Sequence, residues 1–223
     1  MMPLRDKVVT QLHTVQIAHH AEQPVVDFPR IEKVVHRLRS TPPGRLLDVG
    51  YSVGGFADYL VRAGWECTGL DLNKRQHPKI KTIQCDLNNG FPVENEAFDL
   101  VTAGEVIEHM LDESAFLQEC RRVLKPTGQL VLTTPNLSFL VNRLRMLVGK
   151  TPLFVYEAYH YHFHTRRTIV DLVESQGFRV EQVIASHVLY SRRLHPTGWV
   201  FERLADWFPT FGAHLILFAR RIS

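Results

Sequence analysis

The sequence predicts an α/β fold of the Rossmann-like, doubly wound type, in which a mostly parallel seven-stranded sheet carries helices on both faces. Three observations lead to this prediction. Short apolar runs alternate with stretches of helical spacing, a glycine-bearing turn follows the first apolar run, and an acid closes the second. Such alternation is typical of a parallel sheet, because the connection between two parallel strands is usually a helix packed on the sheet.

The predicted elements follow the chain in a regular order. Helices are expected over residues 5–22 and 29–39, before a turn of Thr41-Pro42-Pro43-Gly44. The expected strands cover residues 45–49, 65–70, 82–85, 98–103, 129–134, 178–184 and 213–221, and the expected helices 56–62, 114–124 and 165–175. The single domain 1–223 then consists of a helical extension 1–40, a core 45–134, an insertion or lid 136–164 and a C-terminal part of the sheet 165–223.

Composition limits the class of protein. The 223 residues fit one domain with a sizeable core, and 45% hydrophobic with 22% charged residues is ordinary for a globular chain. No apolar run approaches the roughly 18 residues that span a bilayer, and the start lacks a signal-peptide core, so we expect a cytoplasmic protein. Cys67, Cys85 and Cys120 lack metal-type spacing and are expected to be free thiols. The net charge of +3 permits an anionic partner without requiring one.

A glycine-bearing turn is the first chemical signal. Residues 46–56 read LLDVGYSVGGF, an apolar strand that runs into a turn and then a helix. Glycine lets the backbone approach a ligand closely, and a helix N-terminus presents unpaired N–H donors, although a tight turn without a ligand would use the same residues. Asp71 closes the next strand about 20 residues further on, where a carboxylate can bind ribose hydroxyls. The Gly-x-x-x-Gly spacing of Gly50 and Gly54 disfavours a nicotinamide dehydrogenase.

Over residues 40–185 these features resemble the class I S-adenosylmethionine-dependent methyltransferases, especially the branch of quinone-biosynthesis O-methyltransferases and sugar methyltransferases. The resemblance implies that S-adenosylmethionine binds at this turn, with Asp71 on the ribose and Asp86 on the adenine. Ser52 stands where the family has its middle glycine, which narrows the backbone dihedrals of the turn. The full set of cofactor-binding residues implied is Asp48, Gly50, Tyr51, Gly54, Asp71, Leu72, Asp86, Leu87 and Glu105.

The segment that follows the fourth predicted strand, Gly104 to Met110, matches the same branch through its Glu-x-x-Glu-His pattern. In open parallel sheets, ligands bind at the carboxyl ends of the strands, where this segment is expected. The sulfonium already activates the methyl group, so the protein must align an acceptor and remove the proton of a hydroxyl. We predict His109 as the base and Glu108 as the residue that orients it, with a purely structural role for His109 as the alternative.

A metal-dependent variant of this hypothesis uses the same side chains as ligands. Glu105, Glu108 and His109, with the later His160, resemble the ligand set of magnesium-dependent small-RNA 2′-O-methyltransferases. A divalent ion would lower the pKa of the acceptor hydroxyl and replace the base. Magnesium prefers oxygen ligands, however, so we place no metal in the predicted site and keep Mg²⁺ as an alternative.

A histidine-rich segment, Tyr159 to Arg167, precedes a predicted helix and a Gly177-Phe178 strand start, as in sugar and lipid-linked methyltransferases. The resemblance aligns His160 with the histidine that faces the acceptor, so we predict a catalytic set of His109, His160 and Glu108. On an extended stretch His160, His162 and His164 would share one face. We expect one of the three to be functional and the other two to be solvated.

The acceptor itself is left open by the sequence, because one fold and one cofactor loop serve many acceptors. Residues 137–150 form an apolar helix with basic residues on one side, which favours core or lid over contact with a membrane surface. Aromatic residues at 199–201 and 207–209 add further apolar surface. Together with residues 137–150 they suggest a small-molecule, sugar or lipid-linked acceptor. An RNA-modifying enzyme is disfavoured by the small net charge, and a non-catalytic cofactor-binding subunit is hinted at by Ser52 alone.

Overall fold

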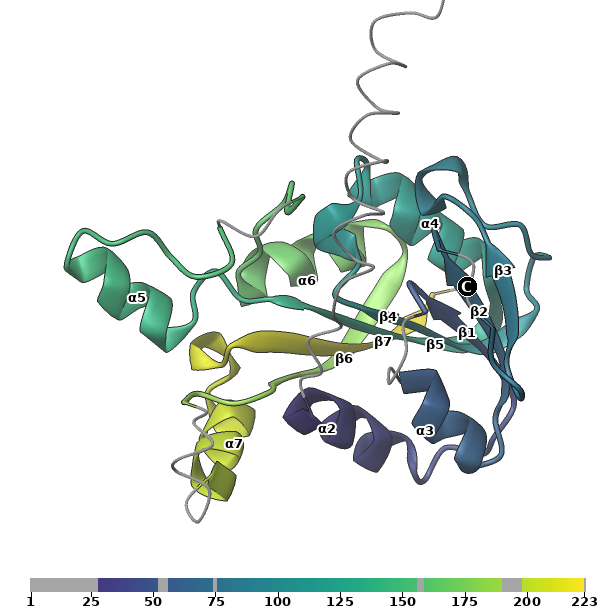
Figure 1. Ribbon diagram of the computed structural model, residues 1–223, viewed down its shortest axis with the longest axis horizontal. Helices are drawn as coiled ribbons and strands as arrows, with labels where there is room; N and C mark the ends of the chain where they lie inside the picture. The colour runs from purple at the N-terminus through teal and green to yellow at the C-terminus, as the bar shows by residue number, and fades with distance from the viewer. Residues whose placement is uncertain (1–27, 52–55, 74–75, 156–158, 190–197, 223) are drawn as a thin grey trace, which may run out of the picture.

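A computed structural model describes residues 28–51, 56–73, 76–155, 159–189 and 198–222, and its centre is a seven-stranded sheet (Figure 1). The strand order is β3-β2-β1-β4-β5-β7-β6. Strands β1 to β5 pair in parallel, whereas β7 is antiparallel to both of its neighbours. The strands are β1 (Arg45–Val49), β2 (Glu66–Asp71), β3 (Lys81–Gln84), β4 (Phe98–Gly104), β5 (Leu124–Pro135), β6 (Phe178–Ala185) and β7 (His214–Arg221).

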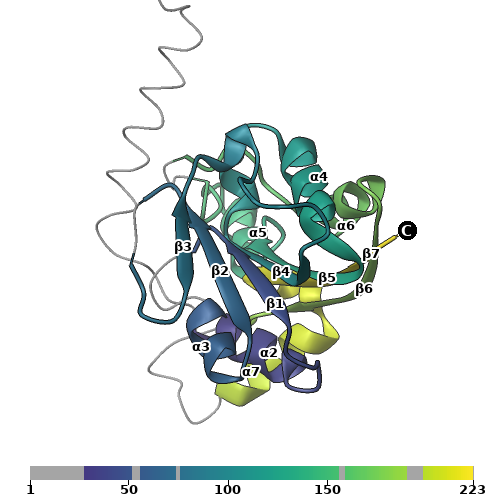
Figure 2. The ribbon, with the colours of Figure 1, turned by 90° about the vertical axis from the view of Figure 1, so that its right-hand side faces the viewer.

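Helices cover both faces of the sheet, so the strands are apolar on both sides. Helices α2 (Phe28–Leu38), α3 (Phe56–Arg62) and α7 (Gly198–Trp207) lie on one face, and α4 (Glu113–Val123) and α6 (Arg166–Ser175) on the other (Figures 1 and 2). Three buried clusters result among the described residues: one under α2 and α3, one under α4 and α6, and a small one of Ala185, Val188 and Ala205 at α7. Among the described residues the remaining helices are η1 (Leu87–Asn89), η2 (Ile107–His109), α5 (Leu140–Leu147) and η4 (Pro209–Phe211).

The order of the strands reverses direction at β1, which lies between β2 and β4. At such a switch point the connections leave toward opposite faces, so the carboxyl ends of β1 and β4 flank an opening where ligands bind in this class of sheet. The turns after β1, β2, β4 and β5 all gather at this edge. The fold therefore brings the predicted cofactor residues and the predicted catalytic residues to the same side of the sheet.

The predicted fold class is confirmed, and most predicted boundaries lie within one or two residues of the observed ones. Strand β5 begins five positions earlier than predicted, because Leu124 pairs with Phe98 before the register shifts. Helix α7 was not predicted as a helix, and the predicted helix over 5–22 lies outside the described residues. The three cysteines are free thiols. Within the part of the chain that the structure describes, no helix combines the length and the apolar character needed to cross a bilayer.

The insertion between β5 and α6 leaves the sheet and returns to it at nearly the same place. Asn136 and His164 form an isolated parallel bridge, and the Leu137 amide donates to the His164 carbonyl over 2.8 Å. Between these ends, α5 projects away from the body of the molecule (Figure 1). Asn142 is the single buried residue of α5, and Leu140 at its start packs, partly buried, against the cluster of Ala185, Val188 and Ala205, so the helix contacts the core through its first turn.

Candidate active site

The turn after β1 is shaped by two close contacts. Gly50 has a φ of +75°, a conformation that favours glycine, and a Cβ at this position would lie 2.3 Å from the Val106 side chain. The amides of Gly50 and Tyr51 both donate to the Leu70 carbonyl over 2.8 Å. The ring of Tyr51 is buried against Gly69 and belongs to the core. The turn is thus held against β2 through Leu70 and against Val106, the residue before η2. Gly54 and Ser52 lie outside the described residues.

Asp48 lies beneath this turn and is only 3% exposed. Its carboxylate accepts a hydrogen bond from the Thr102 hydroxyl over 2.6 Å and a longer one, 3.4 Å, from the Ala57 amide at the start of α3. Burial raises the pKa of Asp48 to about 7, against the lowering effect of these two bonds. Asp48 therefore links β1 to β4 through Thr102 and to α3 through Ala57.

The next acids lie at the ends of β2 and β3. Asp71 is half-buried and accepts a hydrogen bond from the Asn73 amide over 2.6 Å, with Leu72 half-buried beside it. Asp86 caps η1: its carboxylate accepts from the amide of Asn88 and from the side chains of Asn88 and Asn89. Leu87 is buried in the core. Asp71 therefore sits where the ribose role was predicted, whereas both carboxylate oxygens of Asp86 already serve the local turn.

Glu105 follows β4 in a left-handed conformation, with a φ of +57°. Its carboxylate forms an ion pair of 2.6 Å with Arg30, accepts a hydrogen bond of 2.9 Å from Thr133, and lies 3.6 Å from the Nε2 atom of His214. Burial alone would raise the pKa of Glu105, but Arg30, His214 and Thr133 together lower it below its usual value. Glu105 is thus directed toward α2 and β7.

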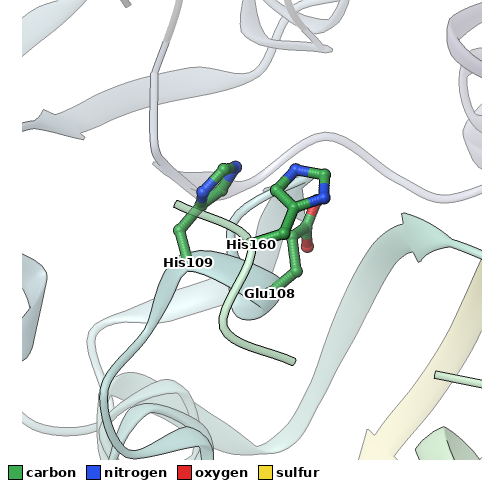
Figure 3. Close-up of side chains that lie close together, drawn as sticks. All are labelled: Glu108, His109 and His160. Atoms are coloured by element: carbon green, nitrogen blue, oxygen red, sulfur yellow. The ribbon is translucent and has the colours of Figure 1, made fainter. Parts of the chain in front are cut away.

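Three side chains converge at η2. Ligand atoms of Glu108, His109 and His160 all lie within 4.8 Å of one another, and Figure 3 shows the two imidazoles and the carboxylate pointing to a common region. The rings of His109 and His160 pack edge to face with centroids 4.6 Å apart. The Glu108 carbonyl accepts the amide of Tyr161 over 2.8 Å, which fixes the histidine segment on η2. The structure therefore brings together the predicted catalytic residues but leaves Glu105 out of their cluster.

The hydrogen bond of His109 determines which ring nitrogen can accept a proton. The Nδ1 atom lies 2.9 Å from the carbonyl oxygen of Tyr159. A carbonyl can only accept, so Nδ1 carries the hydrogen and the neutral ring has its lone pair on Nε2. The Tyr159 carbonyl thus orients the ring, a role that the sequence analysis gave to Glu108. A neutral His109 in this tautomer can take a proton at Nε2.

The pKa of Glu108 is shifted in the opposite direction to that of Glu105. It is 1% exposed, and the Thr134 hydroxyl donates to its Oε2 atom over 3.2 Å, while Oε1 has no hydrogen-bond partner among the described residues. Burial raises the pKa of Glu108 well above its usual value, and the nearby Glu105 raises it further. Protonation of Glu108 is therefore easier than in an exposed glutamate, and the protonated carboxyl would place a hydrogen-bond donor beside the two imidazoles.

The other two histidines of the segment face elsewhere. His164 is buried and bonds to Glu113 through Nε2 over 2.6 Å, and the Nδ1 atom of His162 lies 3.3 Å from the same carboxylate. The prediction that His160, His162 and His164 share one face is wrong, as is the prediction that two of them are solvated. The segment is not a regular strand, so its side chains do not alternate strictly. His162 and His164 instead tie the segment to the start of α4.

Sequence reasoning missed residues that contact this site but lie far from it along the chain. Arg30, which fixes Glu105, lies 75 positions before it, and Tyr159 acts through its backbone carbonyl, which no side-chain pattern reveals. Glu113 carries a weak signal, because it lies at the start of a predicted helix where acids are favoured. Nothing in the order of residues indicates that it receives two histidines.

Comparisons with known proteins agree with this geometry. A family model described as "Methyltransferase domain" matches residues 18–183. A Mycolicibacterium smegmatis protein named "Probable S-adenosylmethionine-dependent methyltransferase" is 31% identical over 169 residues, which are 70% of this chain and 61% of that protein. The human mitochondrial ubiquinone biosynthesis O-methyltransferase is 31% identical over 157 residues, which are 63% of this chain and 42% of that protein. The chain thus spans less than two thirds of the length of either relative.

Among solved structures, the Burkholderia thailandensis 1,6-didemethyltoxoflavin-N1-methyltransferase, bound to 1,6-didemethyltoxoflavin and S-adenosylhomocysteine, has the same architecture. The TM-score is 0.69, with 100% of this chain and 92% of that chain covered. At 14% sequence identity this likeness shows the shared fold alone.

Proposed function

This chain belongs to the S-adenosylmethionine-dependent methyltransferase family, and from that membership we propose that it O-methylates a hydroxyl of a small-molecule, sugar or lipid-linked acceptor. The observation that carries the choice of oxygen is the hydrogen bond from His109 Nδ1 to the Tyr159 carbonyl, which leaves Nε2 as a proton acceptor. The relatives named as ubiquinone biosynthesis O-methyltransferases support the same class of acceptor atom.

In the proposed complex, S-adenosylmethionine lies over the carboxyl ends of β1 and β2. Gly50 lets the backbone approach the methionine part, and Asp71 accepts hydrogen bonds from the ribose hydroxyls. Asp48 shapes the turn from below through Thr102 and Ala57. Asp86 and Leu87 lie at the predicted adenine end, where Asp86 would reach the base only after giving up part of its cap on η1.

The proposed reaction is a single in-line displacement. The acceptor oxygen attacks the methyl carbon, the carbon–sulfur bond breaks, and its electron pair returns to sulfur to give S-adenosylhomocysteine. The hydroxyl proton passes to Nε2 of His109. His160 packs against His109 and would bound the acceptor on that side, and a neutral Glu108 would donate a hydrogen bond to the acceptor oxygen or to an imidazole.

A divalent metal at this cluster is a second candidate, favoured by the buried Oε1 atom of Glu108 and the two nearby imidazoles. The donor set of Glu108, His109 and His160 suits a transition metal such as Mn²⁺ better than Mg²⁺, because magnesium prefers oxygen ligands. A bound ion would lower the pKa of the acceptor hydroxyl. It would also require an ionised Glu108, the reverse of the state that burial favours.

Transfer of a labelled methyl group to panels of catechols, sugars and isolated RNA tests the function, with His109→Asn as the decisive variant. The asparagine amide can replace Nδ1 as the donor to Tyr159 but cannot accept the proton. We expect turnover to fall by about 10²–10⁴-fold, with S-adenosylmethionine affinity by calorimetry unchanged. His162→Gln, which alters a residue that faces Glu113, is the matched control and should keep most of the activity.

Each alternative predicts a different result in the same assays. No methylated product from any panel, with S-adenosylmethionine still bound, would support a non-catalytic binding subunit and overturn the proposal. Methylated RNA alone, with binding that weakens steeply with salt, would support a nucleic-acid acceptor. Stoichiometric Mn²⁺ binding, followed by electron paramagnetic resonance and lost in Glu108→Gln, would favour the metal over the base.

A further inference from the structure

The C-terminal part of helix α5 exposes its apolar side chains, whereas Leu140 in its first turn packs against Ala185, Val188 and Ala205. Its one buried side chain is Asn142, which donates to the Leu137 carbonyl over 3.2 Å and accepts the Leu153 amide over 2.7 Å. The apolar side chains at its C-terminal end face solvent: Leu144 is 54% exposed and Leu147 81% exposed, and Val148, which follows the helix, is 70% exposed. A helix that served only the interior would show the opposite arrangement.

The exposed end of this helix is held in place by its own hydrogen bonds. The Arg145 side chain donates to the Thr151 carbonyl over 2.8 Å, and the Lys150 amide donates to the Arg145 carbonyl over the same distance. Gly149, with a φ of +70°, closes the turn. Leu144, Leu147 and Val148 share one face, because they are spaced by three and four residues. We call residues 144–148 the α5 tip.

The charge around the α5 tip has one sign. Residues 137–155 include Arg143, Arg145 and Lys150 and contain no aspartate or glutamate. A partner that fits this segment must offer an apolar layer and a negative charge beside it. An anionic bilayer surface has both, since its acyl layer accepts apolar side chains and its headgroups attract lysine and arginine. A nucleic acid offers the charge without the apolar layer.

A second exposed face lies on α7, at the same end of the sheet (Figure 1). Trp199 is 60% exposed and Trp207 73% exposed, and the guanidinium of Arg203 lies 5.8 Å from the Trp199 ring. These residues are spaced by four positions and so follow one side of the helix. The α5 helix contacts this region directly, because the Arg143 guanidinium lies 4.9 Å from the ring of Phe211 in η4. Tryptophan is enriched where proteins meet the headgroup layer.

We propose that the α5 tip and the tryptophan face of α7 dock this protein onto the surface of an anionic lipid bilayer. The insertion that carries the α5 tip also carries His160, so docking would bring the acceptor side of the active site toward the membrane. The docking is a property of the surface and does not require methyl transfer. It would give the enzyme access to an acceptor that is dissolved in, or anchored to, the lipid.

Flotation of the full chain with vesicles tests the proposal. The probes are vesicles of phosphatidylcholine alone and vesicles with phosphatidylglycerol added. We expect binding to the anionic vesicles, reduced at least tenfold by Leu147→Ser with Val148→Ser, since two apolar side chains leave the acyl layer. Lys150→Ser should weaken binding about fivefold, by loss of one attracted charge. Ile222→Ser is the matched control: Ile222 is 48% exposed but lies after β7, at the opposite edge of the sheet, and its variant should bind like the parent.

The outcomes separate this proposal from the proposed function. Variants that lose vesicle binding but keep calorimetric affinity for S-adenosylmethionine support the docking surface, whether or not an acceptor has been found. Failure of the parent chain to bind anionic vesicles would overturn it. A parent chain that is dimeric by light scattering and becomes monomeric in the α5-tip variant, without vesicle binding, would assign the surface to a second copy instead.

Discussion

The two halves of the sheet's carboxyl edge hold their acids in different ways. In the cofactor half, the acids after β2 and β3 each accept a backbone amide two residues further along the chain, while Asp48 within β1 accepts both the Ala57 amide and the distant Thr102 hydroxyl. In the acceptor half, after β4, each glutamate is held by side chains that are distant in sequence. The local pairs are Asp71 with Asn73 and Asp86 with Asn88; the distant pairs are Glu105 with Arg30, Glu108 with Thr134 and Glu113 with His164.

This difference shows what each half depends on. Bonds between near neighbours form as soon as the turn forms, so the ends of β2 and β3 need little beyond their own turns, whereas Asp48 also needs β4. The acceptor half needs α2, β5 and the insertion all in place before its carboxyl groups have their native partners. Changes far from the site should therefore disturb the acceptor half more than the cofactor half.

The largest expected effect outside the catalytic cluster comes from removing the distant partner of Glu105. Arg30→Met removes a buried cation and leaves the half-buried Glu105 carboxylate without its partner, so we expect the free energy of unfolding to fall by roughly 3–5 kcal/mol at most in urea denaturation. Lys125→Met is the control, because its ion pair with Asp99 is more than one third exposed and should matter by less than about 1 kcal/mol. Equal losses of stability in the two variants would contradict the expectation that the distant contact of Arg30 matters more than an ordinary surface ion pair.

A somewhat smaller effect should appear in the pH dependence of stability through Asp48. Its pKa is raised in the fold to about 7, so the fold favours the protonated form. The stabilisation is complete below the unfolded value near 4 and is lost as pH rises through 7, on the order of 4 kcal/mol at most. Unfolding free energies measured from pH 4 to 8 should decline more steeply in the parent than in Asp48→Asn. Parallel curves for the two proteins would show that Asp48 is not desolvated as described.

The smallest expected effect concerns affinity for the cofactor. Asp71→Ala removes a carboxylate that is proposed to bind ribose, so calorimetric titration should show S-adenosylmethionine binding weaker by about tenfold to a hundredfold. The fold should persist, because the hydrogen bond that Asp71 accepts comes from the amide of Asn73, two residues away in the same turn. Asp112→Ala, which removes a comparable local bond at the start of α4, provides the control and should leave affinity unchanged. Similar affinity losses in both variants would place the ribose contact elsewhere.

Sequence reasoning succeeded where the governing contacts are local. The strands were found because buried parallel strands are short apolar runs, and Asp71 was found because it closes such a run at a known interval. Glu108, His109 and His160 were also found, but through family resemblance; their convergence joins η2 to a segment about 50 residues later, which periodicity alone cannot predict.

The failures have the same origin. The amphipathic pattern of residues 137–150 indicates that the two sides of the helix differ, but it does not indicate which side contacts the protein. The burial of Asn142 and the exposure of Leu144 and Leu147 therefore could not be predicted. The separation of His160 from His162 and His164 depends on Glu113, a residue of another element. Glu105 was assigned to the cofactor through family resemblance, and no pattern in the sequence indicates that Arg30 pairs with its carboxylate.

The bridge between Asn136 and His164 allows the insertion to change in evolution without disturbing the sheet. Its two ends meet side by side at the edge of the sheet, so the chain between them can lengthen, shorten or change sequence without moving the strands on either side. The entropic cost of a longer closed loop rises only slowly with its length. The same insertion carries both the α5 tip and His160. A change in this one segment could therefore alter both the acceptor and the surface to which the enzyme docks, while the cofactor half stays constant.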